Sequence, residues 1–305
     1  MLAAAVALAG CAALPGSDAP IVTAAAGGAA ASTIVVDGLE RTYLVRAPER
    51  VVADAPLPLL LVIHGAGGNA ARAEAATGLT ALSDADGFIV AYPQGTQAAD
   101  VAGEYSWNAG ACCANPVKKN IDDVGFINAM IDDIALAHPV DPERIFVAGF
   151  SNGGMLAYRL ACELDRRVAG IAVVAGALNV ESCDAPAATS VVMIHGTGDQ
   201  TVPYTGGKTN ERTAGRFGQW HNASLADAVS YWSGRDGCTA SPITAVDGGV
   251  TRASFDACEE GVSVEVVTIK DGGHVWPVKA KGGFDASTFI TQHFGLGGPV
   301  ATLAQ

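Results

Sequence analysis

A serine flanked by glycines follows the hydrophobic run at residues 144–150. The stretch reads RIFVAGFSNGGM, so that Gly149, Ser151 and Gly153 form a G-x-S-x-G pattern. The run before the serine has the apolar continuity of a buried strand, and residues 152–164 have the periodicity of an amphipathic helix. Where a strand turns directly into a helix, the residues on either side of the turn lie close together and side chains there would clash. The glycines therefore indicate a tight turn that exposes the serine hydroxyl. Ser151 is therefore either a helix N-cap or a nucleophile on a strand-to-helix elbow.

Strand and helix patterns alternate along the rest of the chain. A hairpin is expected over residues 32–48, because Asp37-Gly38 is a strong two-residue turn signal. Apolar strand-like runs follow at 56–65, 88–95, 144–150, 168–176, 191–196 and 262–269, and helical patterns at 123–139, 152–164, 224–234 and 284–294. This order predicts one α/β domain with a doubly wound, mostly parallel sheet and an antiparallel N-terminal hairpin. The irregular stretches 94–121 and 200–223 follow strand ends, where sites form in such sheets.

Charge and the N-terminus limit the possible partners and the location of the chain. The 305 residues carry a net charge of −13 without a Lys/Arg-rich run, so we expect no nucleic-acid partner. Residues 1–11 resemble an export signal, and their LAGC ending resembles a bacterial lipobox in which Cys11 is lipidated. The alternative is an alanine-rich leader with a chance cysteine. We expect a tether over 12–31, a catalytic domain over 32–295 and a tail over 296–305 in a secreted or envelope lipoprotein, which contacts membranes only through its lipid anchor.

Six further cysteines agree with export. An even number of cysteines in an exported chain indicates disulfides, and six thiols allow fifteen pairings. The pairing between sequence neighbours is Cys162–Cys183, Cys238–Cys258 and Cys112–Cys113. A metal site is a weak alternative, because the chain has no CxxC pair and no HxxxH spacing, and we expect neither a metal nor a cofactor.

A serine nucleophile needs a histidine base, which in this topology lies downstream. His274 lies in KDGGHVWP, a glycine-rich loop directly after the last strong strand. The other downstream candidates fit less well. His195 ends a strand and is expected to brace a loop, His221 lies in the long loop after Trp220, and His293 lies in the terminal helical pattern.

An acid that orients the base should lie between the serine and the histidine. Asp199 follows a strand end in HGTGDQTVPY, where turn residues suit a carboxylate held by the backbone. Asp271 lies only three residues before His274, which is awkward for facing that ring, and Asp184 and Asp227 lack a strand-end context. Asp199 is therefore the predicted acid, with a simple Asx-turn role as the alternative.

The oxyanion hole of such an elbow uses two backbone N–H groups. One donor follows the nucleophile, which makes it the N–H of Asn152. The other is expected in HGAGG at residues 64–68, after the third strand. We assign it to Ala66, with Gly65 as the alternative.

These motifs together resemble the secreted polyhydroxybutyrate-depolymerase-like esterases, the group that includes feruloyl and acetylxylan esterases of carbohydrate esterase family 1. The resemblance covers about residues 32–294 and includes HGAGG, YPQG, WNAGACC, DDVGFI, GFSNGGM, HGTGD and GGHVWP in order. It implies an α/β-hydrolase fold with Ser151 as nucleophile, Asp199 as acid and His274 as base. Trp107 and Trp276 resemble cleft-lining aromatics of the group, with burial in the core as the alternative.

The sequence thus predicts a secreted serine esterase that acts through an acyl-enzyme. Its expected substrate is a small or oligomeric ester with a short acyl, feruloyl, acetyl-xylan or hydroxybutyrate group, and we expect a monomer. A ligand-binding surface lipoprotein without catalysis and a serine peptidase are the alternative functions. The binding protein would not need a serine, an acid and a histidine in this order, and the peptidase would need an added domain for which the chain has no room.

Overall fold

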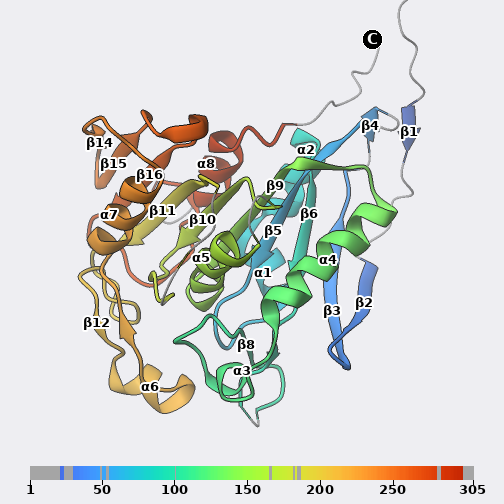
Figure 1. Ribbon diagram of the computed structural model, residues 1–305, viewed down its shortest axis with the longest axis horizontal. Coiled ribbons are helices and arrows are strands. Elements are labelled where there is room, and N and C mark those ends of the chain that lie inside the picture. Colours follow the sequence, from blue (N-terminus) through green and yellow to red (C-terminus); the bar gives the residue numbers. More distant parts are fainter. Residues whose placement is uncertain are drawn as a thin grey trace, which may run out of the picture.

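The computed structural model describes residues 21–23, 30–48, 50–52, 55–99, 101–164, 167–180, 183, 187–279 and 283–297. A ten-stranded sheet crosses the molecule in the order β14-β15-β16-β11-β10-β9-β5-β6-β3-β2 (Figure 1). The six strands from β16 to β6 run parallel, and an antiparallel hairpin borders them at each edge. The ten strands of the sheet are β2 Ala30–Val36, β3 Leu39–Arg46, β5 Leu57–Ile63, β6 Ile89–Pro93, β9 Val140–Phe150, β10 Gly170–Val174, β11 Ser190–Gly196, β14 Ile243–Asp247, β15 Val250–Phe255 and β16 Val264–Ile269.

Helices cover both faces of this sheet (Figure 1). The strand β5 shows why, because Leu59 and Leu61 belong to one hydrophobic core while Leu60 and Val62 belong to the other. The first core is completed by α4 Asp123–Ala137, α5 Asn152–Glu163 and α7 Leu225–Arg235, and the second by α1 Ala70–Thr77, α2 Leu79–Asp86 and α8 Ala286–His293. The predicted doubly wound α/β-hydrolase architecture is confirmed.

The predicted N-terminal hairpin is also confirmed, whereas a second hairpin was not predicted. Asp37 and Gly38 have φ of 49° and 74°, as the turn between β2 and β3 requires. The unpredicted hairpin is β14–β15 at the opposite edge of the sheet. Every residue of β14 is exposed, so its sequence lacks the apolar run that marked the other strands. Helices α1 and α2 were likewise not predicted.

Two excursions rise from the carboxyl ends of the parallel strands. The first contains β7 Thr96–Gln97, β8 Tyr105–Ser106 and α3 Ala114–Lys118. The second contains β12 Gly207–Lys208, α6 Glu211–Phe217 and β13 His221–Asn222, and we call residues 207–222 the α6 cover. Both lie at the same end of the molecule, below the sheet in Figure 1. They correspond to the irregular stretches that the sequence placed after strand ends.

The remaining elements and the cysteines complete the description. A separate two-stranded pair joins β1 Ile21–Thr23 to β4 Arg50–Val52, and a short 3-10 helix covers Glu259–Gly261. The structure pairs the six cysteines between sequence neighbours, as Cys112–Cys113, Cys162–Cys183 and Cys238–Cys258. The predicted signal and Cys11 lie outside the described residues. Within the described ranges, every helix is too short or too polar to span a bilayer.

Candidate active site

Ser151 lies on a strained turn between β9 and α5. Its backbone has φ of 55° and ψ of −121°, a conformation that residues other than glycine rarely adopt. A hydrogen bond from its N–H to the Val174 carbonyl, 2.8 Å long, fixes the turn against β10. Glycines are required on both sides for steric reasons, because a Cβ on Gly149 would overlap the Gly153 carbonyl and one on Gly153 would overlap the Ile63 carbonyl. The side chain of Ser151 makes no N-cap hydrogen bond to α5, so the turn has the form of an elbow.

The structure brings Ser151, His274 and Asp199 together, although 123 and 75 residues separate His274 from the other two. His274 extends from the loop after β16. Its Nε2 lies 2.9 Å from Ser151 Oγ, and its Nδ1 lies 2.7 Å from Asp199 Oδ2. With the proton on Nδ1, the imidazole donates to the carboxylate and accepts from the serine hydroxyl. This is the arrangement a general base needs in order to deprotonate the serine.

Asp199 is held for this task on both of its oxygens. Oδ1 accepts hydrogen bonds from the N–H groups of Thr201 and Val202, at 2.8 and 2.9 Å. Burial raises the pKa of Asp199, but hydrogen bonds from His195 and His274 and the Val202 N–H outweigh burial and hold the pKa well below its usual range. The carboxylate therefore stays charged at neutral pH and can stabilise a protonated imidazole.

The other downstream histidines do not contact Ser151 Oγ, which among the described residues bonds to His274. His195 contacts the Val202 carbonyl through Nε2 at 2.9 Å, and the same atom lies 3.4 Å from Asp199 Oδ2. It therefore braces the loop that carries Asp199, as its position at a strand end predicted. His221 is exposed on β13, and His293 on α8 contacts Ser263.

The two predicted oxyanion donors lie beside the serine. Ala66 and Asn152 both line the cavity that contains Ser151 and His274. The loop that carries Ala66 runs against the elbow, since a Cβ on Gly65 would lie only 3.1 Å from the Ser151 Cβ. The N–H of Asn152 belongs to the first residue of α5, where the helix dipole favours negative charge.

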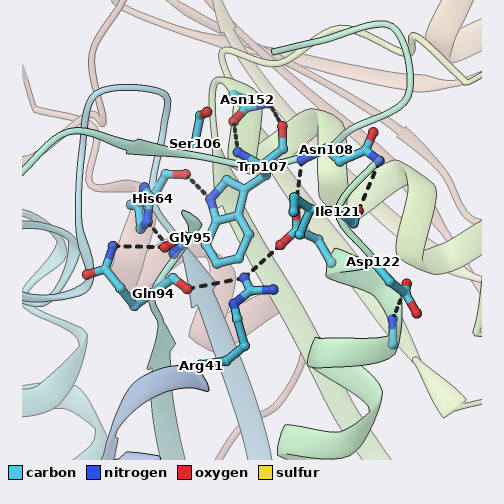
Figure 2. A network of polar contacts seen from close by, with 12 residues as sticks. Arg41, His64, Gln94, Gly95, Ser106, Trp107, Asn108, Ile121, Asp122 and Asn152 are labelled. Carbon is cyan, nitrogen blue, oxygen red and sulfur yellow. Dashed lines mark hydrogen bonds and ion pairs between the residues drawn. The ribbon is translucent and has the colours of Figure 1, made fainter. Parts of the chain in front are cut away.

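Five buried side chains hold this loop and the elbow in place, and we call them the buried network: Arg41, His64, Trp107, Asp123 and Asn152. Figure 2 labels all of them except Asp123. The indole N–H of Trp107 donates to the His64 carbonyl at 2.8 Å. The backbone N–H of Trp107 donates to Asn152 Oδ1 at 2.8 Å, and Asn152 Nδ2 donates back to the Trp107 carbonyl at 3.2 Å. Trp107 thereby joins the two segments that carry the predicted oxyanion donors.

Arg41 and Asp123 lie beneath this connection as an ion pair of 2.7 Å, 3% and 0% exposed. The second carboxylate oxygen accepts from the Asn108 N–H at 2.7 Å, and the guanidinium lies 3.9 Å from the centre of the Phe126 ring. Burial raises the pKa of Asp123, while the charge of Arg41 and the hydrogen bonds from Asn108 and Arg41 oppose the shift without cancelling it. The network thus fixes the segment around residues 107–108 from below.

His64 is a neutral member of the network. Its Nε2 accepts from the Gly95 N–H at 3.1 Å, so that Nδ1 carries the proton and donates to the Gly65 carbonyl at 2.9 Å. Burial lowers the pKa of His64 to about 4, while the hydrogen bond to Gly65 opposes the shift and the charge of Arg41 adds to it. The histidine of HGAGG therefore positions the loop and does not line the cavity.

The aromatic residues differ from the prediction. Trp107 is fully buried in the network, so the expectation that it lines the cleft is wrong. Trp276 lines a separate cavity of about 250 Å³, and its indole N–H donates to Ser287. Trp220 from the α6 cover lines the Ser151 cavity instead, with its indole N–H bonded to Asn222 at 2.7 Å. Its place in the irregular stretch 200–223 does not distinguish it from Trp107, which lies in the irregular stretch 94–121.

The cavity at Ser151 has a volume of about 620 Å³. Its inner wall is apolar, and its outer rim is polar and comes largely from α6. The inner residues are Ala66, Cys112, Cys113, Phe150, Met155, Val202, Phe217 and Trp220, and the rim residues are Gln200, Thr201, Asn210, Glu211, Arg212, Thr213 and Arg216. A site of this kind suits an amphipathic ligand of modest size.

Known proteins resemble this chain in sequence. A family described as phospholipase/carboxylesterase matches residues 52–227. The putative esterase NocK of Nocardia uniformis subsp. tsuyamanensis is 32% identical over 81% of this chain and 74% of its own length. Feruloyl esterase B of Piromyces equi is 30% identical over 77% of this chain, which spans only 42% of that relative.

Solved structures resemble it in fold. An acetyl xylan esterase from Aspergillus awamori superimposes with a TM-score of 0.60 over 88% of this chain and 99% of its own, at 14% identity. A carboxylesterase from Mesorhizobium loti superimposes with a TM-score of 0.53 over 86% of this chain and 98% of its own, at 15% identity. At this identity the likeness concerns the fold alone.

Proposed function

The chain belongs to the phospholipase/carboxylesterase family and is a carboxylic ester hydrolase, and on that premise we propose that it is an exported serine esterase acting through an acyl-enzyme. The observation that carries this proposal is the continuous contact from Ser151 Oγ through His274 to Asp199. Each of the three groups has the geometry that its step requires.

In the first step, Ser151 Oγ attacks the ester carbonyl carbon while His274 Nε2 takes the hydroxyl proton. Asp199 stabilises the resulting imidazolium through Nδ1. The N–H groups of Ala66 and Asn152 hold the oxyanion of the tetrahedral intermediate. As this intermediate collapses, Nε2 gives its proton to the departing alcohol and leaves an acyl group on the serine.

In the second step, water attacks the acyl carbon while His274 Nε2 takes one of its protons. The collapse of this second intermediate releases the acid and returns the proton to Ser151 Oγ. Every bond change is accounted for by the ester, one water and the three side chains. The reaction as proposed needs neither a metal nor a cofactor.

The cavity supports a substrate with a short or aromatic acyl group. Its apolar inner wall reaches from Ala66 to Trp220, and about 620 Å³ accommodates a feruloyl, acetyl or hydroxybutyryl group with part of its alcohol. Relatives are named feruloyl esterase and acetylxylan esterase, which agrees with this range. We propose that the enzyme acts as a monomer on small or oligomeric esters.

The test is hydrolysis of p-nitrophenyl acetate, p-nitrophenyl butyrate, methyl ferulate and a hydroxybutyrate oligomer by the wild type and Ser151→Ala. We expect the variant to fold normally and to lose at least about 10⁴-fold in kcat, as removal of a triad nucleophile does. A fluorophosphonate probe should label the wild type alone. A wild type that neither turns over any ester nor reacts with the probe would favour the ligand-binding lipoprotein, and amide hydrolysis in preference to esters would favour the peptidase.

Export with a lipid anchor is a separate part of the proposal. The LAGC sequence that ends at Cys11 and the three disulfides support it. Expression of the full chain in a bacterial host should give a membrane-bound lipoprotein, and Cys11→Ala should release it from the membrane fraction. Retention of the variant in that fraction would exclude the lipobox.

A further inference from the structure

The α6 cover presents two arginines to the cavity that holds Ser151. Arg212 and Arg216 are four residues apart on the seven-residue helix α6, and both line the rim. Residues at this spacing lie on the same face of a helix. Two cations on one face repel each other unless anions compensate both of them. We therefore ask of each guanidinium which anion it binds.

Arg216 has its compensating anion within the protein. Its guanidinium binds both oxygens of Glu104, in the loop that precedes β8, through Nε at 3.1 Å and through Nη2. It also lies 4.9 Å from the centre of the Phe217 ring. Phe217 and Arg216 in turn lie over the HGAGG loop, since a Cβ on Gly67 would approach them to 3.2 and 3.4 Å. Arg216 therefore has a structural role, because it holds α6 above the HGAGG loop.

Arg212 has no such anion. Among the residues that the structure describes, it makes no hydrogen bond and no ion pair, and it is exposed on the cavity rim. Glu104 is already occupied by Arg216. Glu211 also lines the rim, but adjacent side chains on a helix do not face each other. One guanidinium at the mouth of the cavity thus remains available to an anion from outside.

The negative net charge of the chain makes the Arg212 cation favourable for an anionic substrate. With 31 acidic and 18 basic residues, the protein repels anions over most of its surface. A cation on the rim of the cavity that holds Ser151 offsets that repulsion where an anionic substrate would enter. Arginine also suits a carboxylate in particular, because its planar fork can donate two parallel hydrogen bonds.

We propose that Arg212 binds a carboxylate on the substrate, so that the enzyme prefers esters that carry a free carboxylate remote from the scissile bond. This inference rests on the proposed esterase function and narrows its substrate class. The carboxylate can belong to either side of the ester. On the alcohol side it is the free end of a hydroxyacid oligomer, and on the acyl side it is the second carboxyl group of a dicarboxylic acid monoester.

The experiment compares matched anionic and neutral esters by proton release or product analysis. The alcohol-side pair is the 3-hydroxybutyrate dimer and its terminal methylamide. The acyl-side pair is monomethyl adipate and methyl hexanoate. The enzymes are the wild type, Arg212→Gln, Arg212→Lys and Lys208→Gln, where Lys208 is an exposed residue of the α6 cover outside the cavity lining, so that its change alters the net charge equally.

We expect the ratio of anionic to neutral kcat/KM to fall about tenfold in Arg212→Gln, mainly through KM, as loss of a charge-assisted hydrogen bond predicts. Arg212→Lys should restore part of the ratio, and Lys208→Gln should keep it. The pair of esters whose kcat/KM ratio falls in Arg212→Gln identifies the side of the ester that carries the carboxylate. Hydrolysis with ratios that Arg212→Gln leaves unchanged in both pairs would overturn the carboxylate site and leave the esterase standing. Failure to hydrolyse any of the four esters would overturn the carboxylate preference, and the esterase itself would fall only if the p-nitrophenyl esters, methyl ferulate and the fluorophosphonate probe were also left unreacted.

Discussion

The layers below and above the Ser151 cavity are built in opposite ways, and we call them its lower and upper walls, although Asn152 is the one member of the buried network that lines the cavity itself. Beneath the serine, the members of the buried network are at most 3% exposed, and their polar atoms bond mainly to one another and to nearby backbone. Above it, the helix α6 of the cover has no buried residue and depends on an exposed ion pair from Arg216. In the proposed mechanism the lower wall positions the oxyanion donors, whereas the upper wall meets the substrate.

This contrast separates reaction chemistry from substrate choice. Oxyanion donors must keep their positions to within a fraction of an ångström, and only packed, satisfied side chains provide that rigidity. A substrate-contacting wall needs accessible side chains, so it gains little stability from burial. We therefore expect changes in the buried network to alter stability and kcat, and changes in the α6 cover to alter KM.

The largest effect on stability is expected from Asp123→Asn. The substitution leaves the buried Arg41 charge without its counterion, and breaking such a pair costs about 3–5 kcal/mol. Urea unfolding with the disulfides intact would measure the loss. The control is Asp132→Asn, which breaks the exposed pair with Arg167 and should cost about 1 kcal/mol or less. Equal losses in both variants would mean that the network does not act as a buried unit.

A smaller effect is expected from the titration of His64. Its folded pKa of about 4 lies below the unfolded value near 6.5, so between these values the unfolded chain binds more protons. The free energy of unfolding contributed by His64 is therefore complete above pH 6.5 and is lost as pH falls towards 4, by about 3 kcal/mol. His138 and His293, whose pKa values burial also lowers, add to the same slope.

The measurement is the free energy of unfolding against pH for the wild type and His64→Gln. The variant removes the titrating group, so its curve should be flatter between pH 6.5 and 4 even if it is less stable throughout. His138 and His293 are present in both proteins, so the part of the slope that they cause is the same in both curves. Parallel curves would show that the pKa of His64 is the same in the folded and unfolded states, so that burial does not keep it neutral between pH 6.5 and 4.

The lower wall was predictable only where local sequence defines it. The elbow, HGAGG and the order of Ser151, Asp199 and His274 follow from motifs that each occupy a few residues. The ion pair from Arg41 to Asp123 joins positions 82 residues apart, and no local pattern marks either residue as a partner of the other. The network was missed for this reason.

Trp107 and Trp220 show a second limit of prediction from the sequence. A tryptophan in an irregular stretch suits a core and a cleft equally well, and only the fold decides which it enters. Trp107 is drawn beneath the elbow by its bonds to His64 and Asn152, whereas Trp220 reaches the cavity from the α6 cover. The exposed hairpin β14–β15 was missed because strand prediction depends on apolar runs that edge strands lack.

The smallest effect on stability, and the sharpest test of the contrast, is expected from Glu104→Gln. This is the same acid-to-amide change as Asp123→Asn, but its partner Arg216 is 53% exposed, so solvent screening limits the loss to about 1 kcal/mol or less. Without the ion pair, α6 is held over Gly67 mainly by Phe217, and the substrate-facing wall becomes looser. KM should therefore rise severalfold while kcat stays close to that of the wild type, because the contacts among Ser151, His274 and Asp199 are untouched.

Steady-state kinetics with p-nitrophenyl butyrate and urea unfolding of the same preparation would separate the two effects, with Asp132→Asn as the control for loss of an exposed pair. A fall in kcat with KM unchanged would mean that α6 helps to position the oxyanion loop, which it touches at Gly67. A stability loss as large as that of Asp123→Asn would mean that helix α6 is part of the folded core, to which Trp220 of the cover already belongs. Either result would remove the division between a rigid lower wall and a substrate-selecting upper wall, because one structure would then serve both purposes.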